Sequence, residues 1–168
     1  SNNTIKGCTT TNNVIGISLN GDNNTVNSNT ISNNGELEVY PSEYGDGTWL
    51  EYVFGGSIEL SGYNNTIYHN NFINNLGSIE VDDNSWDDDY PSGGNYWSNY
   101  NGTDFYSGPY QNINGSDGIG DVPYDIDSDT QDRYPLMRPF PYHEHDLAVS
   151  LRTSDWHPMY GTSSILEA

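Results

Sequence analysis

The 168-residue sequence predicts an all-β protein, a right-handed parallel β-helix built from short coils. Two observations predict this fold. Asn and Gly dominate the polar residues, and apolar residues recur at fixed positions in segments of about twenty residues. A unit of that size cannot close a hydrophobic core alone, so its copies must stack on one another.

Three aligned segments define the repeat, and they begin at Gly16, Ser57 and Ser78. Each carries an Ile and then a Leu or Val two positions later, so that stacking produces two inward columns: Ile17, Ile58 and Ile79, then Leu19, Leu60 and Val81. Asn at the corners tolerates left-handed backbone angles and can hydrogen-bond to the coils above and below. Leucine-rich repeats are the competing solenoid, but the sequence has neither their L-x-x-L-x-L pattern nor a helical period.

Residues 1–83 are therefore predicted to form the coils, with residues 36–55 inserted between two of them. The insertion has two alternating runs around a Pro- and Gly-rich turn, which predicts a hairpin or long loop. Insertions in solenoids gather on one face, often the binding face. Tyr40, Trp49 and Tyr52 are the candidate residues for binding a glycan or a surface protein. The alternative is that the aromatic residues of the insertion pack over the side of the coils.

Beyond the repeats, residues 84–140 are rich in Trp, Tyr, Gly and Asp, and are predicted to form an irregular cap over the C-terminal end of the coils. Residues 141–168 are predicted to be a tail or linker. The sequence starts in mid-repeat, which leaves two interpretations open. The chain is a piece of a longer surface protein, or its open coil self-associates head-to-tail with another copy, as a filament subunit does.

The charge is strongly negative: four Lys and Arg stand against 24 Asp and Glu, giving a net charge of −20. Such a charge disfavours nucleic acid and anionic membranes as partners and makes divalent cations the natural counter-ions. No apolar run approaches the roughly 18 residues of a transmembrane helix, so no membrane insertion is expected. The single Cys8 cannot form an internal disulfide.

Five triplets match the acceptor pattern for N-glycosylation, which is typical of secreted proteins. Their asparagines are Asn2, Asn23, Asn64, Asn101 and Asn114. An Asn-rich chain also produces such triplets by chance. Together with the charge, they favour an extracellular, cell-surface location.

Acidic residues form the strongest local constellation, and six of them are the candidate metal ligands: Asp117, Asp121, Asp125, Asp127, Asp129 and Asp132. Alternating Asp in a Gly-flanked loop supplies the oxygen ligands that Ca²⁺ prefers. The pattern departs from an EF-hand loop at Thr130 and Leu136, so the prediction is a calcium-stabilised cap. The alternative is a solvated loop whose Asp side chains cap turns. A weaker acidic cluster comprises Asp82, Asp83, Asp87, Asp88 and Asp89.

Four motifs of the C-terminal half resemble the end of a NosD-like β-helix domain, a family also described as carbohydrate-binding and sugar-hydrolase (CASH) domains. They are Asn-Ser-Trp at 84–86, Gly-Asn-Tyr-Trp-Ser-Asn-Tyr at 94–100, Ser-Asp-Gly-Ile-Gly-Asp-Val-Pro-Tyr at 116–124, and Asp-Arg-Tyr-Pro-Leu-Met at 132–137. The resemblance covers residues 1–140 and implies a cell-surface protein, of a kind abundant in archaea.

The family name derives from an accessory protein for copper-site assembly, a role that does not transfer by fold alone. A copper site here would draw on His143, His145, His157, Met137, Met159 or Cys8. The simpler interpretation of the first two histidines is an incidental, solvent-facing pair.

Catalysis is not expected. Lyases on such folds need a cation to stabilise a developing anion, and the sequence offers Lys6, Arg133, Arg138 and Arg152 alone. Carboxylates for a glycosidase are so abundant that they single out no pair. The predicted function is therefore a structural and binding module that is stabilised by Ca²⁺ and presents a loop to a glycan or protein. A filament subunit is the second hypothesis, a carbohydrate-active enzyme the third, and a metal-delivery factor the fourth.

Overall fold

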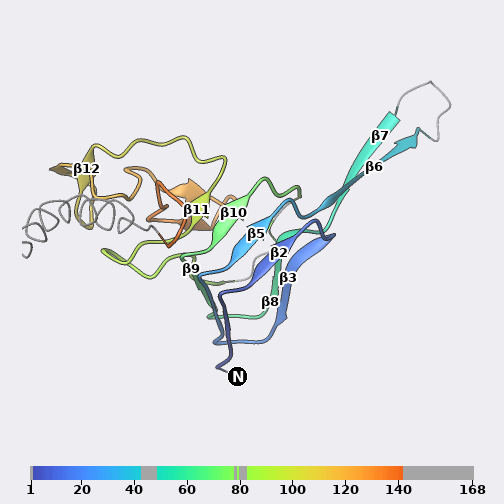
Figure 1. Ribbon diagram of the computed structural model, residues 1–168, viewed down its shortest axis with the longest axis horizontal. Coiled ribbons are helices and arrows are strands. Elements are labelled where there is room, and N and C mark those ends of the chain that lie inside the picture. Colours follow the sequence, from blue (N-terminus) through green and yellow to red (C-terminus); the bar gives the residue numbers. More distant parts are fainter. Residues whose placement is uncertain (1, 43–48, 78, 80–82, 142–168) are drawn as a thin grey trace, which may run out of the picture.

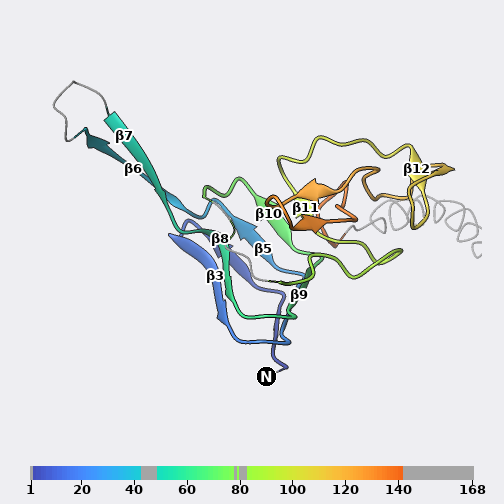
Figure 2. The same ribbon diagram turned by 180° about the vertical axis from the view of Figure 1, so that it is seen from behind.

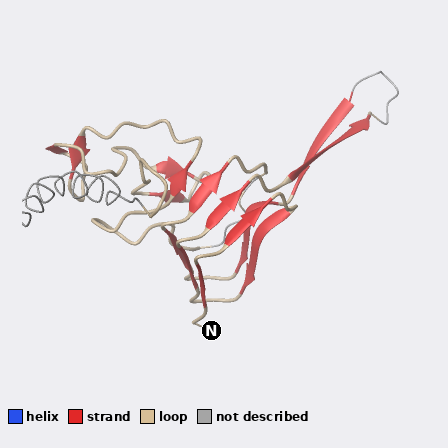
Figure 3. Cartoon of the chain, viewed as in Figure 1, coloured by secondary structure: helices blue, strands red, loops and turns tan. Residues whose placement is uncertain are grey.

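The computed structural model describes residues 2–42, 49–77, 79 and 83–141, and within them all regular structure is β-strand (Figure 3). The described residues contain no helix that is long and apolar enough to cross a membrane. The protein is thus all-β, and its N-terminal half consists of short strands in parallel sheets and one antiparallel hairpin (Figure 1).

Three parallel sheets make up that half, and neighbouring strands in each sheet come from successive repeats. Their strands, in sheet order, are β1 (Thr4–Lys6), β4 (Thr25–Asn27) and β9 (Thr66–Tyr68) in the first; β2 (Thr9–Thr11), β5 (Thr30–Ser32), β10 (Asn71–Ile73) and β11 (Tyr96–Trp97) in the second; β3 (Ile15–Asn20) and β8 (Gly56–Ser61) in the third. The chain therefore returns to the same sheet once per repeat. Consecutive strands of a repeat lie in different sheets, and the described residues contain no crossover helix.

Apolar side chains stack in columns between the sheets. Ile17 pairs with Ile58, and Leu19 with Leu60, as the sequence alignment predicted for the first two repeats. Ile79 is half-buried and packs against this core, whereas Val81 lies outside the described residues. Each fully buried side chain of this kind contributes roughly 1.5–3 kcal/mol of hydrophobic stabilisation. The core is therefore shared between repeats, since its residues come from several of them.

Asparagine ladders hold the repeats together at their corners. In one ladder, the Asn24 backbone N–H and its Nδ2 both donate to Oδ1 of Asn65, at 2.8 and 3.0 Å. In the same way, the backbone N–H and Nδ2 of Asn3 both donate to Oδ1 of Asn24. The same two groups of Asn65 donate to Oδ1 of Asn84. The sequence predicted Asn for these corners because buried amides need partners from the neighbouring coil.

The spacing of the ladder locates an insertion of 20 residues. Ladder partners are 21 residues apart between the first and second repeats and 41 apart between the second and third, and the difference is 20. The extra residues include β6 (Glu36–Pro41) and β7 (Trp49–Phe54), which pair with each other in an antiparallel hairpin. This hairpin, here called the arm, projects away from the parallel sheets in both views (Figures 1 and 2).

A cap of residues 84–141 covers the other end of the stack. It adds β11 to the second sheet and two small antiparallel pairs, which are β12 (Tyr106–Ser107) with β13 (Ile113–Asn114) and β14 (Tyr124–Asp125) with β15 (Gln131–Asp132). Aromatic rings continue the core into the cap, because Phe72 stacks on Trp97 and Trp97 stacks on Tyr124, each at 4.3 Å between centroids. The predicted tail begins at residue 141, and its residues 142–168 lie outside the described residues.

Candidate functional site

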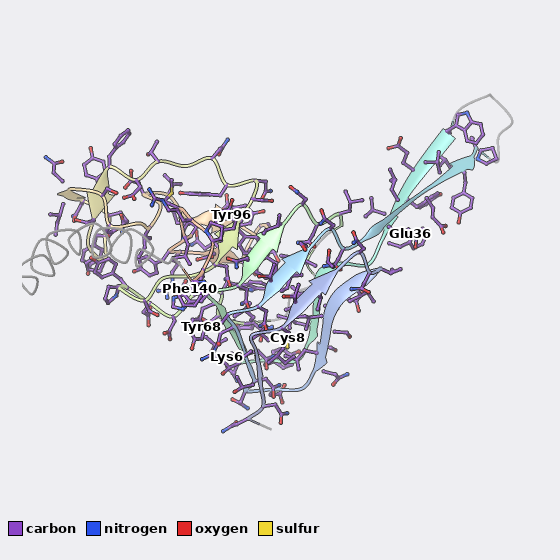
Figure 4. The ribbon with its side chains drawn as sticks, in the orientation of Figure 1. Lys6, Cys8, Glu36, Tyr68, Tyr96 and Phe140 are labelled. Atoms are coloured by element: carbon purple, nitrogen blue, oxygen red, sulfur yellow. The ribbon has the colours of Figure 1, made fainter. Side chains whose placement is uncertain are left out.

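The arm has two faces, set by the pairing of its strands, because directly opposed residues of an antiparallel pair point to the same side. One face carries the pairs Glu36 with Phe54, Glu38 with Tyr52, and Tyr40 with Leu50. We call it the aromatic face. The other, here the aliphatic face, carries Leu37 with Val53, Val39 with Glu51, and Pro41 with Trp49. Figure 4 shows Glu36 where the arm leaves the sheets.

Large apolar side chains on both faces of the arm are exposed. Trp49 is 66% exposed, and Tyr40 and Tyr52 are 47% and 48% exposed. The aromatic residues therefore do not pack over the coils. The structure places Tyr40 and Tyr52 together on the aromatic face, with ring centroids 5.9 Å apart, and Trp49 on the opposite face. The three candidate binding residues thus form no single flat surface.

Glycines at the base let the arm leave the stack without disturbing it. Gly35 and Gly55 both have positive φ, at 92° and 65°. A Cβ on Gly55 would meet the carbonyl oxygen of Val14 at 2.1 Å, and a Cβ on Gly77 would meet that of Gly55 at 2.3 Å. The repeats before and after the insertion are therefore in backbone contact across it, and the arm begins at a fixed point.

Aspartates of the cap that are not fully buried accept hydrogen bonds from nearby backbone. Asp121 accepts from the backbone N–H of Phe105 and Tyr106, both at 2.9 Å, and from the Thr103 hydroxyl at 3.0 Å. Desolvation raises the pKa of Asp121, but these donors outweigh it, so the pKa lies below its usual value. Asp127 accepts two backbone N–H bonds at 2.8 Å in its own turn.

These contacts match the alternative interpretation of the acidic segment, in which Asp side chains cap turns. In the part of the chain that the structure describes, no three His, Cys, Asp or Glu side chains are grouped so that they could hold a metal ion. Asp117, Asp125 and Asp129, all exposed, belong to the same segment. The structure thus gives the Ca²⁺ prediction no support, and the observed role of Asp117, Asp121 and Asp127 is to cap turns.

Asp132 is fully buried and ends a second ladder of amides. In that ladder Asn29 donates to Asn70, Asn70 to Asn95, and the Asn95 backbone N–H to Asp132 Oδ2 at 2.7 Å. The same oxygen accepts from Trp97 Nε1 at 2.9 Å. Burial raises the pKa of Asp132 from 3.8 to about 7, although these hydrogen bonds oppose the rise. A side chain predicted to bind Ca²⁺ is thus a buried structural carboxyl group.

An ion pair joins the two ends of the cap, and sequence reasoning missed it. Arg133 Nε donates to Asp87 Oδ2 at 2.9 Å, and its Nη2 reaches Asp87 at 2.5 Å and Asp89 at 2.6 Å. The Asp87 side chain is only 2% exposed, so Arg133 neutralises a buried carboxylate. Two members of the weaker acidic cluster are therefore committed to this pair. Asp87 and Asp89 are 46 and 44 residues from Arg133 in the sequence, so no local signal pointed to the pair.

All five glycosylation candidates are exposed: Asn2, Asn23, Asn64, Asn101 and Asn114. Three of them follow one corner of the stack, because the Thr residues of their triplets pair across the first sheet. Asn23 and Asn64 adopt left-handed backbone angles, with φ of 57° and 56°. The triplets are therefore accessible, and they are also part of the repeat.

A copper site does not fit the described residues. Cys8 is exposed, and Met137 lies in the cap. His69 is engaged by protein groups, because its Nε2 lies 2.7 Å from the Ser92 carbonyl oxygen and its ring stacks on Phe140 at 4.1 Å. Figure 4 marks Phe140 near Tyr68, the neighbour of that histidine. The other candidates, His143, His145, His157 and Met159, lie outside the described residues.

By its fold, the chain belongs to the all-β proteins in which short strands of successive repeats pair in parallel sheets. The family described as periplasmic copper-binding protein (NosD) matches residues 1–102, more than half of the chain. The chain is therefore a member of the NosD family, as its motifs at 84–86 and 94–100 predicted. The family's periplasmic description agrees with the extracellular location expected from the sequence. No curated protein and no solved structure matches the chain.

Proposed function

We propose that this NosD-family chain is a non-catalytic extracellular contact module, a right-handed parallel β-helix that holds the arm away from its coils. The observation that carries the proposal is the arm itself. A two-stranded hairpin is at best marginally stable alone in water, yet this one exposes large apolar side chains on both faces. Exposed apolar surface of this kind marks an interaction site, for a glycan or a protein.

Two features support the β-helix. Strands of successive repeats pair in parallel and in register in three separate sheets. The amide ladders add hydrogen bonds along the same direction at the corners. Both are the expected result of coils stacked on each other, with the insertion leaving the stack between two of them.

The position of Arg133 supports a non-catalytic role. Its guanidinium is held by two carboxylates, Asp87 and Asp89, and so is committed to the cap. A lyase-type reaction would need a free cation beside the developing anion.

The experiment compares the full chain with a variant that lacks residues 36–55. This deletion restores the 21-residue spacing of the ladder, so the variant keeps the stack and loses only the arm. We expect the full chain to sediment with cell envelopes of its source organism and the deletion variant to stay in the supernatant. The melting temperatures of the two should agree within a few degrees, which checks that the coils remain folded.

The matched control is Tyr110→Ala, which removes an aromatic side chain that is 83% exposed on the cap. This variant should bind envelopes as the full chain does. Equal binding by the deletion variant would show that the arm is not the contact surface and would contradict the proposal.

A further inference from the structure

We propose that the arm binds a protein segment in extended conformation, one whose side chains alternate between cationic and aliphatic, along the free edge of β6. The proposal rests on the function proposed above and names the chemistry of the partner. It follows from three properties of the arm, which are its open edges, the alternation along β6, and its charge.

The first property is the open edge. β6 and β7 form a sheet of two strands, so each has one edge whose backbone N–H and C=O groups face away from its partner. Such an edge is a template for an added strand. A third strand would also stabilise the arm, because three strands fold more readily than two.

The second property is the alternation of side chains along β6. Glu36 and Glu38 lie on the aromatic face, whereas Leu37 and Val39 lie on the aliphatic face and are both 48% exposed. A strand added beside β6 places its own side chains alternately on the same two faces. Lys or Arg on the first face would meet the two carboxylates, and an aliphatic residue on the second would cover the apolar pair.

The third property is charge. The insertion 36–55 contains five acidic residues and no Lys, Arg or His. Its partner is therefore cationic. A second copy of this chain carries a net charge of −20 and is repelled. A neutral glycan would leave the negative charge of these acidic residues uncompensated.

The test measures binding of a fluorescent, end-blocked octapeptide of alternating Lys and Val by fluorescence anisotropy. We expect the peptide to bind the full chain and not the variant that lacks residues 36–55. Glu36→Gln with Glu38→Gln should weaken binding about five-fold, because two favourable cross-strand charge pairs are lost. Asp125→Asn with Asp129→Asn makes the same charge change on the cap and should leave the affinity unchanged.

Two further probes separate strand addition from simple charge attraction. The same octapeptide N-methylated at every residue keeps its charge but loses the backbone donors of both edges, and it should not bind. A peptide of alternating Glu and Val should not bind either. Equal binding of the N-methylated peptide, or equal weakening by both pairs of substitutions, would overturn the proposal.

The remaining outcomes distinguish this proposal from the one on which it rests. If envelopes bind the full chain through the arm but the Lys–Val peptide does not bind, the arm is a contact surface for another class of partner, and the present inference fails. Binding of a neutral oligosaccharide at the arm would also show that the partner belongs to another class, and the present inference would fail. If the deletion variant still binds envelopes, the contact-module proposal fails.

Discussion

Asp132 is the residue at which the amide ladder ends. Three asparagines precede it, and each uses its side-chain oxygen to accept from the repeat before it. A carboxylate accepts in the same way and has no amide hydrogens of its own, so it suits the last position of the ladder. Asp132 is fully buried at this position, and burial makes the negative charge of its carboxylate energetically costly.

The raised pKa of Asp132 predicts that acid stabilises the fold near neutral pH. The folded pKa is about 7 against 3.8 in the unfolded chain, so the folded state binds this proton more tightly. The contribution to stability is complete below pH 3.8 and is lost as the pH rises through 7, a loss of about 4 kcal/mol at 1.36 kcal/mol per pKa unit. Melting temperatures from pH 4 to 8 should therefore fall more steeply for the wild type than for Asp132→Asn.

The control for this measurement is Asp125→Asn, which removes an exposed carboxylate from the same strand pair. Its melting curve should keep the steep wild-type dependence on pH. If Asp132→Asn shows that same dependence, the titrating group lies elsewhere.

The side chain of Asn70 makes hydrogen bonds with four other residues. Its Nδ2 donates to the carbonyl oxygens of Val26 and Tyr68, and its Oδ1 accepts from Asn29. Asn70→Ala leaves these buried groups unpaired, so the free energy of unfolding should fall by about 2–4 kcal/mol. Urea denaturation measures the change, and the exposed Asn112→Ala serves as a control that should alter it by less than about 0.5 kcal/mol.

At the scale of elements, the cap is held by turn-capping carboxylates and by the pair of Arg133 with Asp87. The acidic residues of this segment already accept hydrogen bonds from backbone N–H groups. Adding millimolar Ca²⁺ or excess chelator should therefore leave the melting temperature unchanged within about a degree. A rise of several degrees in Ca²⁺, reversed by chelator, would contradict this and would restore the calcium-stabilised cap of the sequence prediction.

Elements within one repeat were predictable, because they depend on spacing that the sequence displays. The pairs Ile17 with Ile58 and Leu19 with Leu60 follow from aligning the repeats by eye. The position of the hairpin also coincides with the segment that interrupts the repeat. The shared face of Tyr40 and Tyr52 did not follow, since these residues lie on different strands and only the cross-strand register shows that they point to the same side.

The cap was less predictable because its contacts join distant parts of the sequence. Asp132 was assigned to a calcium site on the basis of its acidic neighbours, whereas 37 residues separate it from the Asn95 that buries it in the ladder. Nothing in the local composition distinguishes this buried aspartate from its exposed neighbours. Burial of a charge is a property of the tertiary structure, and a pattern of Asp and Gly cannot reveal it.

At the scale of the whole molecule, the negative net charge and the exposed apolar side chains of the arm have complementary effects. A net charge of −20 produces mutual repulsion between copies of the chain, which we expect to oppose aggregation through the exposed aromatic residues of the arm. The same charge attracts a cationic partner from a distance. The molecule can thus expose a surface that a neutral protein would have to bury.

Because the strands of successive repeats pair in register, the number of repeats sets the height of the arm. Each additional repeat inserted below the arm would add one strand to every parallel sheet and lift the arm by about 4.8 Å, leaving its base unchanged. The glycine contacts at that base are all with adjacent repeats, so they would travel with the arm. A surface protein of this construction can therefore set the height at which it meets its partner by gaining or losing whole repeats, without any change in the residues that make the contact.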